Sequence, residues 1–334
     1  MKILVTGGAG YIGSTTCSAL LDAGHTPVIL DSLINGRRAF TDGRIFYQGD
    51  IADEALLRRI FADHPDIQAA IHFAALIVVP ESVAHPYEYY KENVGKSLEL
   101  FRLLNELGCK RILFSSSASI YDTKADFMVR EEDPLRPMSP YARTKYMMEM
   151  VLEDTCRAYG MRGLALRYFN PIGADPAMRT GPYDPAPSHV LGKMVSAAQG
   201  KIDEFLLTGT DWPTRDGTGI RDYVHIWDLA RAHVRSVERF DEVFAKTGGS
   251  YLVINLGTGT GITVRELLDA FERVYGRKIA TRVAPPRPGD VAGAYANADR
   301  ARELLGWQAQ RSVEQGIRDA LKWTDEVRPK ILGY

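Results

Sequence analysis

Cysteine is scarce in this sequence, and it has neither an excess of one charge nor a long apolar run. The 334 residues include three cysteines, Cys17, Cys109 and Cys156, none of them at a CxxC spacing, which argues against a disulfide framework and a zinc site. The formal net charge of −1 leaves no basic surface for nucleic acid or an anionic membrane. No apolar run approaches the roughly 20 residues that span a bilayer, and the first one runs into a glycine motif instead of a signal-peptide cleavage site. We therefore expect a cytoplasmic protein without a metal centre.

Short apolar runs alternate with amphipathic segments through the first half of the chain. The runs predict strands over 2–8, 26–31, 44–50, 69–75 and 110–117. Helical periodicity lies between them, over 11–23, 54–64 and 93–107. Such alternation is typical of parallel βαβ units, whose right-handed crossovers place helices on both faces of the sheet. The sequence predicts an α/β fold with a doubly wound parallel sheet.

Three regularly spaced glycines, Gly7, Gly10 and Gly13, follow the first predicted strand and open the first helix. In that context glycines permit a tight turn, the approach of a pyrophosphate to the backbone, and close packing of helix on strand. The helix N-terminus adds free amides and a partial positive charge. Asp31, at the end of the second strand, can bond ribose hydroxyls and would repel a 2′-phosphate. The pattern predicts a Rossmann-type domain that prefers NAD to NADP, with Asp50 either at the adenine edge or in a turn.

The second half of the chain differs from the first in composition. Five prolines fall within 170–190, and a similar stretch covers 284–297, so we expect loops that assemble a substrate pocket there. Residues 251–259 nevertheless read as another sheet strand. At this length two lobes are expected. We predict an NAD-binding Rossmann domain over 1–170, with returning segments near 222–260, and a smaller interleaved substrate-binding α/β lobe over 171–334.

A tyrosine and a lysine four residues apart, Tyr141 and Lys145, begin the next helical pattern. At this spacing both side chains fall on one helical face. An ammonium near a phenol lowers the phenol pKa from about 10 toward the working range and makes it a usable base. Upstream, the strand over 110–117 ends in three serines, and a hydroxyl at that edge can bond a substrate oxygen as its proton leaves. These groups predict an enzyme acting on a substrate hydroxyl.

The motifs resemble those of the extended short-chain dehydrogenase/reductase family and, within it, the group of UDP-glucose 4-epimerases. The similar segments, in that group's order, include GGAGYIG, IHFAA, FSSSASIY, SPYARTK, RYFNPIGA, PTRDGTGIRDYVHIWDLA, INLGTGTGITV and RPGD. They extend over essentially the whole chain. DGTGIRDYVH is the most specific, because it belongs to the expected substrate lobe and not to cofactor binding.

This resemblance implies roles for individual residues. Tyr141 would be the base, Lys145 would tune it and hold the nicotinamide ribose, and Ser117 would bond the sugar 4-oxygen. An NAD site would be lined by Gly7, Gly10, Tyr11, Ile12, Gly13, Asp31, Asn35, Asp50, Ile51, Phe73, Ala74, Ala75, Asn93, Ser115, Tyr141, Lys145 and Phe169. A UDP-sugar would be held by Ser117, Asn170, His189, Val190, Leu206, Arg221, Arg287, Asp290 and Ala294. Two arginines on a diphosphate also suit the near-neutral net charge.

The implied reaction is an epimerisation at C4 of a UDP-sugar. Hydride passes to NAD, the flat 4-keto sugar turns over while held through UDP, and hydride returns to the opposite face, so no external redox partner is needed. A homodimer is also implied, through the helical segments 146–156 and 93–107. This enzyme would interconvert UDP-galactose and UDP-glucose.

The sequence departs from the family pattern at a few positions. Some relatives have a lysine beside the nicotinamide, and in this chain that neighbourhood contains Ile77 instead. Asp122 stands where glycine is common, and His189 replaces an asparagine found in some relatives. Ala294 lies where a bulky tyrosine excludes the N-acetyl group in glucose-restricted members. We therefore hypothesise that UDP-GlcNAc and UDP-GalNAc also fit.

Other functions remain open at this level. A UDP-glucuronate or UDP-pentose 4-epimerase is not separated from the main interpretation by sequence. A 4,6-dehydratase would place an acidic residue beside the active hydroxyl, whereas this run reads SSSAS. A non-catalytic NAD-binding sensor would be expected to lack the tyrosine or the lysine, and both are present.

Overall fold

The computed structural model describes residues 1–286 and 290–334. In this part of the chain, seven strands form one parallel sheet in the order β12-β7-β5-β4-β1-β2-β3. Their bounds are β1 Lys2–Thr6, β2 Thr26–Asp31, β3 Ile45–Gln48, β4 Ile67–His72, β5 Arg111–Ser117, β7 Arg162–Tyr168 and β12 Tyr251–Leu256. The predicted α/β class is confirmed, and the strand predicted over 251–259 joins the sheet at its edge.

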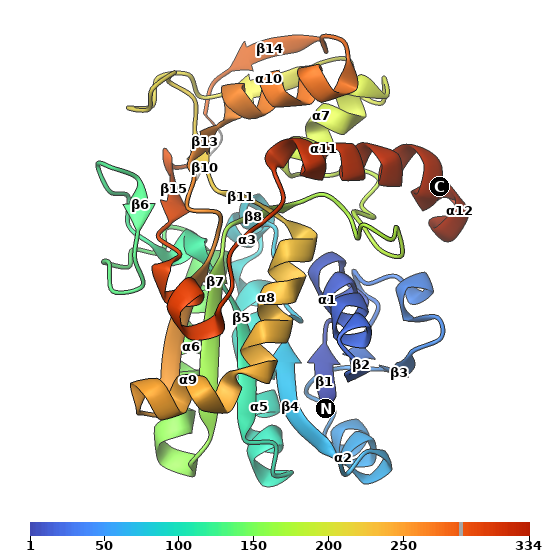
Figure 1. The fold of residues 1–334 in the computed structure, drawn as a ribbon, viewed down its shortest axis with the longest axis vertical. Helices are drawn as coiled ribbons and strands as arrows, with labels where there is room; N and C mark the ends of the chain where they lie inside the picture. Colours follow the sequence, from blue (N-terminus) through green and yellow to red (C-terminus); the bar gives the residue numbers. More distant parts are fainter. Residues whose placement is uncertain (287–289) are drawn as a thin grey trace.

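Helices cover both faces of this sheet (Figure 1). Side chains alternate along each strand, so in β1 Ile3 and Val5 enter one core and Leu4 enters the other. The first core is closed by α1 Tyr11–Asp22, α8 Ile226–Glu238 and α9 Phe240–Thr247. The second is closed by α2 Glu54–Asp63, α5 Lys96–Glu106 and α6 Pro140–Tyr159. The sheet is therefore doubly wound, as the alternating pattern predicts.

Local sequence fixes where α6 begins. The Ser139 hydroxyl accepts a hydrogen bond from the Ala142 amide at 3.1 Å, and Pro140 occupies the first helical position, where its missing N–H costs nothing. Gly160 follows the helix with φ 64°, the left-handed conformation that commonly ends a helix. Tyr141 is thereby placed in the first turn, at the end of α6 nearest the carboxyl edge of the sheet.

The second part of the molecule lies beyond the carboxyl edge of the sheet (Figure 1). It has its own core, built mainly from α7 Val190–Ala198, α10 Val264–Tyr275 and α11 Val313–Lys322. Its short strands are β8 Asn170–Ile172, β9 Phe205–Thr208, β10 Ile220–Arg221, β11 Tyr223–His225, β13 Ile262–Thr263, β14 Thr281–Ala284 and β15 Gly293–Ala296. The strand β6 Met128–Val129, from the first half, joins β15.

The remaining helical elements are short connections. They are α3 Val79–Ala84, α4 Pro86–Tyr89, α12 Arg328–Leu332, the 3₁₀ turns η1 Arg38–Thr41 and η3 Ala118–Ile120, and the π-helical turns η2 Tyr90–Gly95, η4 Ala301–Leu305 and η5 Trp323–Val327. The turn η2 precedes α5, so the helix predicted from residue 93 begins with a wider turn.

The prediction that 170–190 and 284–297 are entirely loop is wrong at two places. Residues 170–172 form β8, which pairs with β11, and residues 293–296 form β15, which pairs with β10 and β6. Both strands are stabilised by partners more than 50 positions away in the sequence. Local proline and glycine content cannot report such pairing.

The three cysteines are free and buried. Across residues 1–286 and 290–334, no helix has both the length and the apolar content to cross a membrane. Over the same ranges, the side chains of His, Cys, Asp and Glu form no group of three or more that could hold a metal ion.

Candidate functional site

The strand order reverses between β1 and β4, and this defines the site. From β1 the chain continues to β2 and β3 on one side, whereas β4 leads to β5, β7 and β12 on the other. In open α/β sheets, ligands bind outside the carboxyl ends of the strands at such a switch point. The predicted groups that end or follow these strands are Gly7 after β1, Phe73–Ala75 after β4, Asp31 at the end of β2 and Ser117 at the end of β5. The fold thus gathers them along one edge.

The glycine loop after β1 is packed too tightly for side chains. Gly7 has φ +72°, and a Cβ there would lie 2.6 Å from the Ala74 amide nitrogen. A Cβ on Gly13 would lie 2.2 Å from the Gly7 carbonyl oxygen. Gly10 is the N-cap of α1, and no side chain among the described residues caps it. The first-turn amides of α1 are therefore presented to a ligand, and this cradle fits a pyrophosphate.

Replacing Gly13 with alanine should destabilise the protein by about 3 kcal/mol and abolish NAD retention, because a methyl group cannot displace backbone atoms. Thermal unfolding and the absorbance of released cofactor measure both effects. Gly95→Ala is the matched control: its Cβ would meet only the Tyr90 carbonyl, at 4.0 Å, so stability should stay level or rise slightly. Equal behaviour of the two variants would contradict the proposed packing role of Gly13.

The two carboxylates predicted at the cofactor differ in their surroundings. Asp31 is buried, and its oxygens accept hydrogen bonds from the amides of Ala9 at 2.9 Å and Leu33 at 2.8 Å. Burial raises the pKa of Asp31, and those two bonds partly oppose the rise. Asp50 instead pairs with the Lys96 ammonium and accepts from a turn amide. Asp31 is held as a rigid acceptor at the end of β2.

The catalytic candidates meet where β5 ends and α6 begins. The Ser117 hydroxyl lies close enough to the Tyr141 phenol to lower the phenol pKa, and its oxygen is hydrogen-bonded to the Ser119 hydroxyl at 2.9 Å. The Lys145 Nζ, on a side chain that is almost fully buried, donates to the Ser115 carbonyl at 2.8 Å and lies 6.0 Å from the centre of the Tyr141 ring. The fold therefore brings the predicted triad together.

The predicted lowering of the phenol pKa is wrong for the protein chain. Burial raises the pKa of Tyr141, and the nearby Ser117 hydroxyl lowers it only in part. Burial also lowers the pKa of Lys145 to about 7, against the opposing charge of Glu149. The reason is desolvation, which disfavours the charged form of both groups.

Several side chains predicted at the cofactor also hold the framework. Asn93 donates to the Leu76 carbonyl at 2.9 Å and to the Thr144 hydroxyl at 3.1 Å, and it accepts from the Leu76 amide at 2.7 Å. The Ser115 hydroxyl bonds the Tyr168 hydroxyl. The Asn93 contacts fix the loop after β4 relative to α6, and the Ser115 contact ties β5 to β7. Ile77 is 61% exposed in that loop.

Apart from Ser117, the predicted substrate residues within the described ranges belong to the second part of the molecule, beyond the carboxyl edge of the sheet. Asn170 opens β8, Val190 opens α7, and Leu206 is exposed on β9. Arg221 and Ala294 are direct register partners in the parallel pair β10·β15. The Arg221 guanidinium donates to the carbonyls of Ile220 at 2.7 Å, Ala292 at 2.9 Å and Val291 at 3.1 Å. Asp290 precedes β15, and Arg287 lies outside the described residues.

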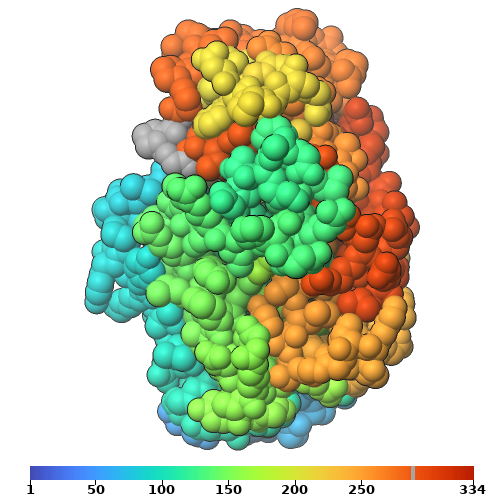
Figure 2. Space-filling model, turned by 90° about the vertical axis from the view of Figure 1, so that its left-hand side faces the viewer, coloured from blue at the N-terminus to red at the C-terminus, as the bar shows by residue number. Residues whose placement is uncertain are grey.

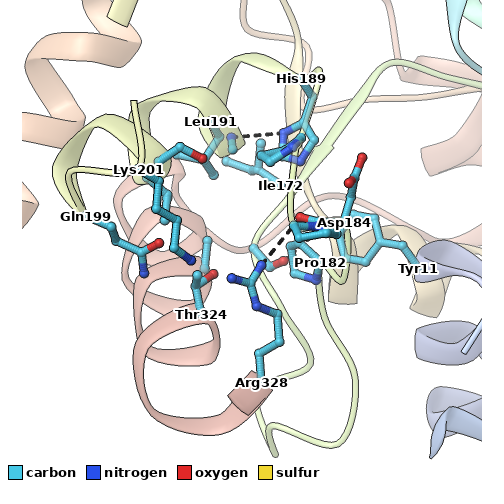
Figure 3. Close-up of a pocket in the computed structure, with 17 residues that line it drawn as sticks. Tyr11, Ile172, Pro182, Asp184, His189, Leu191, Gln199, Lys201, Thr324 and Arg328 are labelled. Carbon is cyan, nitrogen blue, oxygen red and sulfur yellow. Dashed lines mark hydrogen bonds between the residues drawn. The ribbon is translucent and has the colours of Figure 1, made fainter. Parts of the chain in front are cut away.

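His189 and Tyr11 line a small pocket between α7 and the C-terminal segment (Figure 3). The His189 Nδ1 accepts from the Gly192 amide at 3.1 Å and caps α7. The Tyr11 hydroxyl donates to the Gly173 carbonyl at 2.6 Å. The cavity volume of about 20 Å³ admits roughly one water molecule. As it stands, this pocket encloses no dinucleotide, so the cradle at the sheet edge is the stronger candidate for the NAD site.

Sequence reasoning missed a buried ion pair directly behind the serines. Glu149 accepts from the Nε of Arg167 at 2.9 Å and from its Nη2 at 2.6 Å, and it also accepts from the Ser116 hydroxyl. Both charged side chains are about 4% exposed. Two signals could have revealed the pair: Tyr141, Lys145 and Glu149 repeat every four residues on one helical face, and Arg167 interrupts an otherwise apolar strand.

Comparison with known proteins gives consistent matches over most of the chain. Residues 3–257 match the NAD dependent epimerase/dehydratase family. The UDP-glucose 4-epimerase of Bacillus subtilis is 42% identical over 97% of this chain and 96% of that protein. A solved UDP-glucose-4-epimerase from Stenotrophomonas maltophila, with bound NAD and formylated UDP-arabinopyranose, superposes with a TM-score of 0.91, 37% identity and 97% coverage of both chains. The UDP-Glc/GlcNAc 4-epimerase of Campylobacter jejuni gives a TM-score of 0.81 and 32% identity, over 96% of this chain and 98% of that one.

Proposed function

This chain belongs to the NAD dependent epimerase/dehydratase family, and we propose that it is a UDP-glucose 4-epimerase, an isomerase that interconverts UDP-galactose and UDP-glucose. The observation that carries the proposal is that Tyr141, Lys145 and Ser117 come together where β5 ends and α6 begins, with the Lys145 Nζ 6.0 Å from the centre of the Tyr141 ring and bonded to the Ser115 carbonyl. The identity of 42% to a protein of that name over nearly the full length supports the same reaction.

The residues present fit NAD as the bound cofactor. The cradle of Gly7, Gly10 and Gly13, in which Gly7 and Gly13 leave no room for a side chain, would receive the pyrophosphate, while the fixed oxygens of Asp31 would accept from the adenosine ribose. Ile12, Asn35, Ile51 and Phe169 complete the proposed lining. When bound, NAD would supply the reversible hydride transfer at C4 of the sugar. Lys145 would hold the nicotinamide ribose.

Tyr141, as the phenolate, would take the proton of the sugar 4-hydroxyl, with Ser117 bonding the same oxygen. The positive charges of Lys145 and of the nicotinamide of bound NAD would favour that phenolate, against the burial that raises the Tyr141 pKa in the protein alone. Because both hydroxyls end at one point on the edge of the sheet, the 4-oxygen is oriented before its proton leaves. Tyr141 then returns the proton after the keto sugar has turned over, which completes the inversion at C4.

The protein is proposed to bind its substrate through the UDP group and not through the hexose. Arg221, held by three carbonyls, would bind the diphosphate, and Arg287 would assist from outside the described residues. Asn170, His189, Val190, Leu206 and Asp290 would complete the proposed UDP site. A sugar held only through its UDP can turn over, and this is the physical requirement of the reaction.

Conversion of UDP-galactose to UDP-glucose by the purified protein, without added NAD, tests this function. A panel with UDP-GalNAc, UDP-GalA and UDP-arabinose then separates the related 4-epimerases, including those acting on UDP-glucuronate or UDP-pentoses. Protein that retains NAD but converts none of these substrates would be a sensor. We also propose a cytoplasmic location, a role in galactose metabolism, and a cofactor lobe over 1–170 and 222–260 that is interleaved with the rest.

A second substrate class is favoured by Ala294. Its methyl group lies beside Arg221 across the β10·β15 pair, where little side-chain volume limits the sugar. We expect UDP-GalNAc to be accepted, and Ala294→Tyr should lower kcat/KM for UDP-GalNAc by roughly 30-fold or more while changing that for UDP-galactose less than about threefold. A coupled assay on both substrates measures the ratio. An unchanged ratio would show that this position does not limit the sugar.

A homodimer is proposed through α5 and α6, which pack beside each other. Figure 2 shows α6 (green) and the segment from α3 to α5 (cyan) on one face of the molecule. On these helices Leu98, Met147 and Met150 are 40–48% exposed, and large apolar side chains at the surface mark contact sites when they cluster. The proposed partner is a second copy of this chain.

Substituting Met150 with glutamate should convert the dimer to monomer, because a carboxylate cannot be desolvated in an apolar interface. Sedimentation velocity measures the change. Leu21→Glu on α1, where the side chain is also 44% exposed, is the control and should leave the assembly intact. A wild-type protein that sediments as a monomer would refute this assembly.

A further inference from the structure

Residues 121–136 form an excursion from the sheet, which we call the bridging segment. It leaves just after the serine strand β5 and returns before α6. Its base is closed by an antiparallel bridge between Tyr121 and Leu135 and by a hydrogen bond from the Arg136 amide to the Ile120 carbonyl at 2.8 Å. In Figure 1 its strand β6 lies beside β15, in the second part of the molecule. One end therefore adjoins the catalytic groups and the other contacts the substrate side.

Phe127 has an unusual backbone conformation at the far end of the bridging segment. Its φ of 59° lies in the left-handed region, which bulky residues rarely adopt. Only 9% of its surface is exposed, and the ring packs with Ile220 and Ala292, beside Trp212 and Tyr295. Its carbonyl accepts from the Tyr295 amide at 2.9 Å. The Phe127 amide also donates to the Lys124 carbonyl at 3.2 Å, so the conformation is sustained by a local turn together with contacts to β10 and β15.

The residues on which the Phe127 ring packs also hold the Arg221 side chain. The Arg221 Nη1 donates to the carbonyls of Ile220 and Ala292, at 2.7 and 2.9 Å. These are the two buried residues against which the Phe127 ring packs. A shift of the ring would therefore move the carbonyls that orient the guanidinium. Phe127 acts on Arg221 without any need to touch a ligand.

The near end of the bridging segment is tied to the sheet. The Tyr121 hydroxyl donates to the Asn255 side-chain oxygen at 2.7 Å, and the Asn255 amide group donates to the Val129 carbonyl at 3.2 Å. Asn255 belongs to β12. Since both ends are fastened, the segment sets the position of β10 and β15 relative to the end of β5.

We propose that Phe127 is a positioning residue for the nucleotide-sugar: its ring, packed on Ile220 and Ala292, fixes the Arg221 guanidinium relative to Ser117 and Tyr141. The inference rests on the proposed function, in which Arg221 binds the diphosphate. Strained residues persist where the surrounding structure holds them, and they concentrate at ligand clamps. Loss of the ring weakens the hold on UDP while the proton transfer at Tyr141 proceeds as before.

Binding of UDP to the NAD-loaded protein, measured by isothermal titration calorimetry, tests this role. Phe127→Gly removes the ring and relieves the backbone strain, and Phe127→Ala removes the ring alone. Each should raise the Kd for UDP about tenfold, and the KM for UDP-galactose likewise, with kcat within about threefold of wild type. Phe127→Leu, which refills the apolar site, should restore both constants to within about threefold.

Met178→Gly is the matched control, because Met178 also has a positive φ, of 56°, but packs in a different cluster with Phe40 and Trp323. Its Kd for UDP should equal that of wild type. Unchanged UDP binding in Phe127→Ala, or equal weakening in Met178→Gly, would overturn the proposal, and the alanine variant decides alone if the glycine variant does not fold. A protein that binds UDP but does not convert UDP-galactose refutes the proposed function instead, and the UDP comparison still decides the role of Phe127.

Discussion

Tyr141→Phe should lower kcat for UDP-galactose about a thousandfold, which is within the contribution of a positioned general base. The substitution removes one oxygen, and with it the group that takes the proton of the 4-hydroxyl. Ser117 remains but has no partner to receive that proton. The ring and its packing are retained, so bound NAD and the melting temperature should stay close to those of wild type. Initial rates at saturating UDP-galactose, with NAD quantified after denaturation, measure the effect.

Tyr146→Phe is the matched control for that experiment. Tyr146 lies on the same helix, five residues later, and is also partly buried, but it is outside the proposed site. Its rate should be unchanged. If Tyr141→Phe turned over UDP-galactose at the wild-type rate, another group would have to be the base, and the proposed mechanism would fail even though the fold is shared with epimerases.

Arg167→Met should cost about 3–5 kcal/mol of the free energy of unfolding, the usual penalty for leaving a buried charge without its partner. Glu149 would remain about 4% exposed and would keep only the Ser116 hydroxyl as a donor. Because Ser116 stands between Ser115 and Ser117, its displacement would also disturb the hydrogen bond of Lys145 and the placement of Ser117 beside Tyr141. Urea unfolding of the NAD-loaded protein measures the loss.

The double variant Glu149→Met, Arg167→Met separates the pair from its surroundings. With neither charge present there is no unpaired ion, so it should be more stable than Arg167→Met alone. Arg58→Met, which breaks exposed pairs with Glu54 and Glu106, is the control and should have a much smaller effect than Arg167→Met. Additive losses in the double variant would show that Glu149 and Arg167 do not depend on each other.

The sheet was predictable because its signals are local. The apolar run 26–31 coincides with β2. In β1, successive apolar side chains enter opposite cores: Ile3 and Val5 enter one and Leu4 enters the other. The glycine spacing and the cap at Ser139 similarly act over a few residues. Burial on both faces and tight turns each leave a mark in the sequence itself, so the carboxyl edge could be located before the structure was known.

Other features had no local signal. The strands β8 and β15 form only because β11 and β10 pair with them, and the prolines around them indicate loop. The pKa of Tyr141 was predicted in the wrong direction, because the spacing to Lys145 reveals proximity but not burial. The ion pair of Glu149 with Arg167 did leave signs, yet the two residues had to be placed on facing elements before those signs could be connected.

The sequence by itself determined the sheet, the glycine cradle and the presence of Tyr141, Lys145 and Ser117, because spacing and periodicity act between neighbouring residues. Only the tertiary structure decided how the groups are hydrogen-bonded and which charges are buried. It also decided that Phe127 packs on Ile220 and Ala292, whose carbonyls hold Arg221. Those properties depend on desolvation and on contacts between distant segments, which arise when the chain has folded.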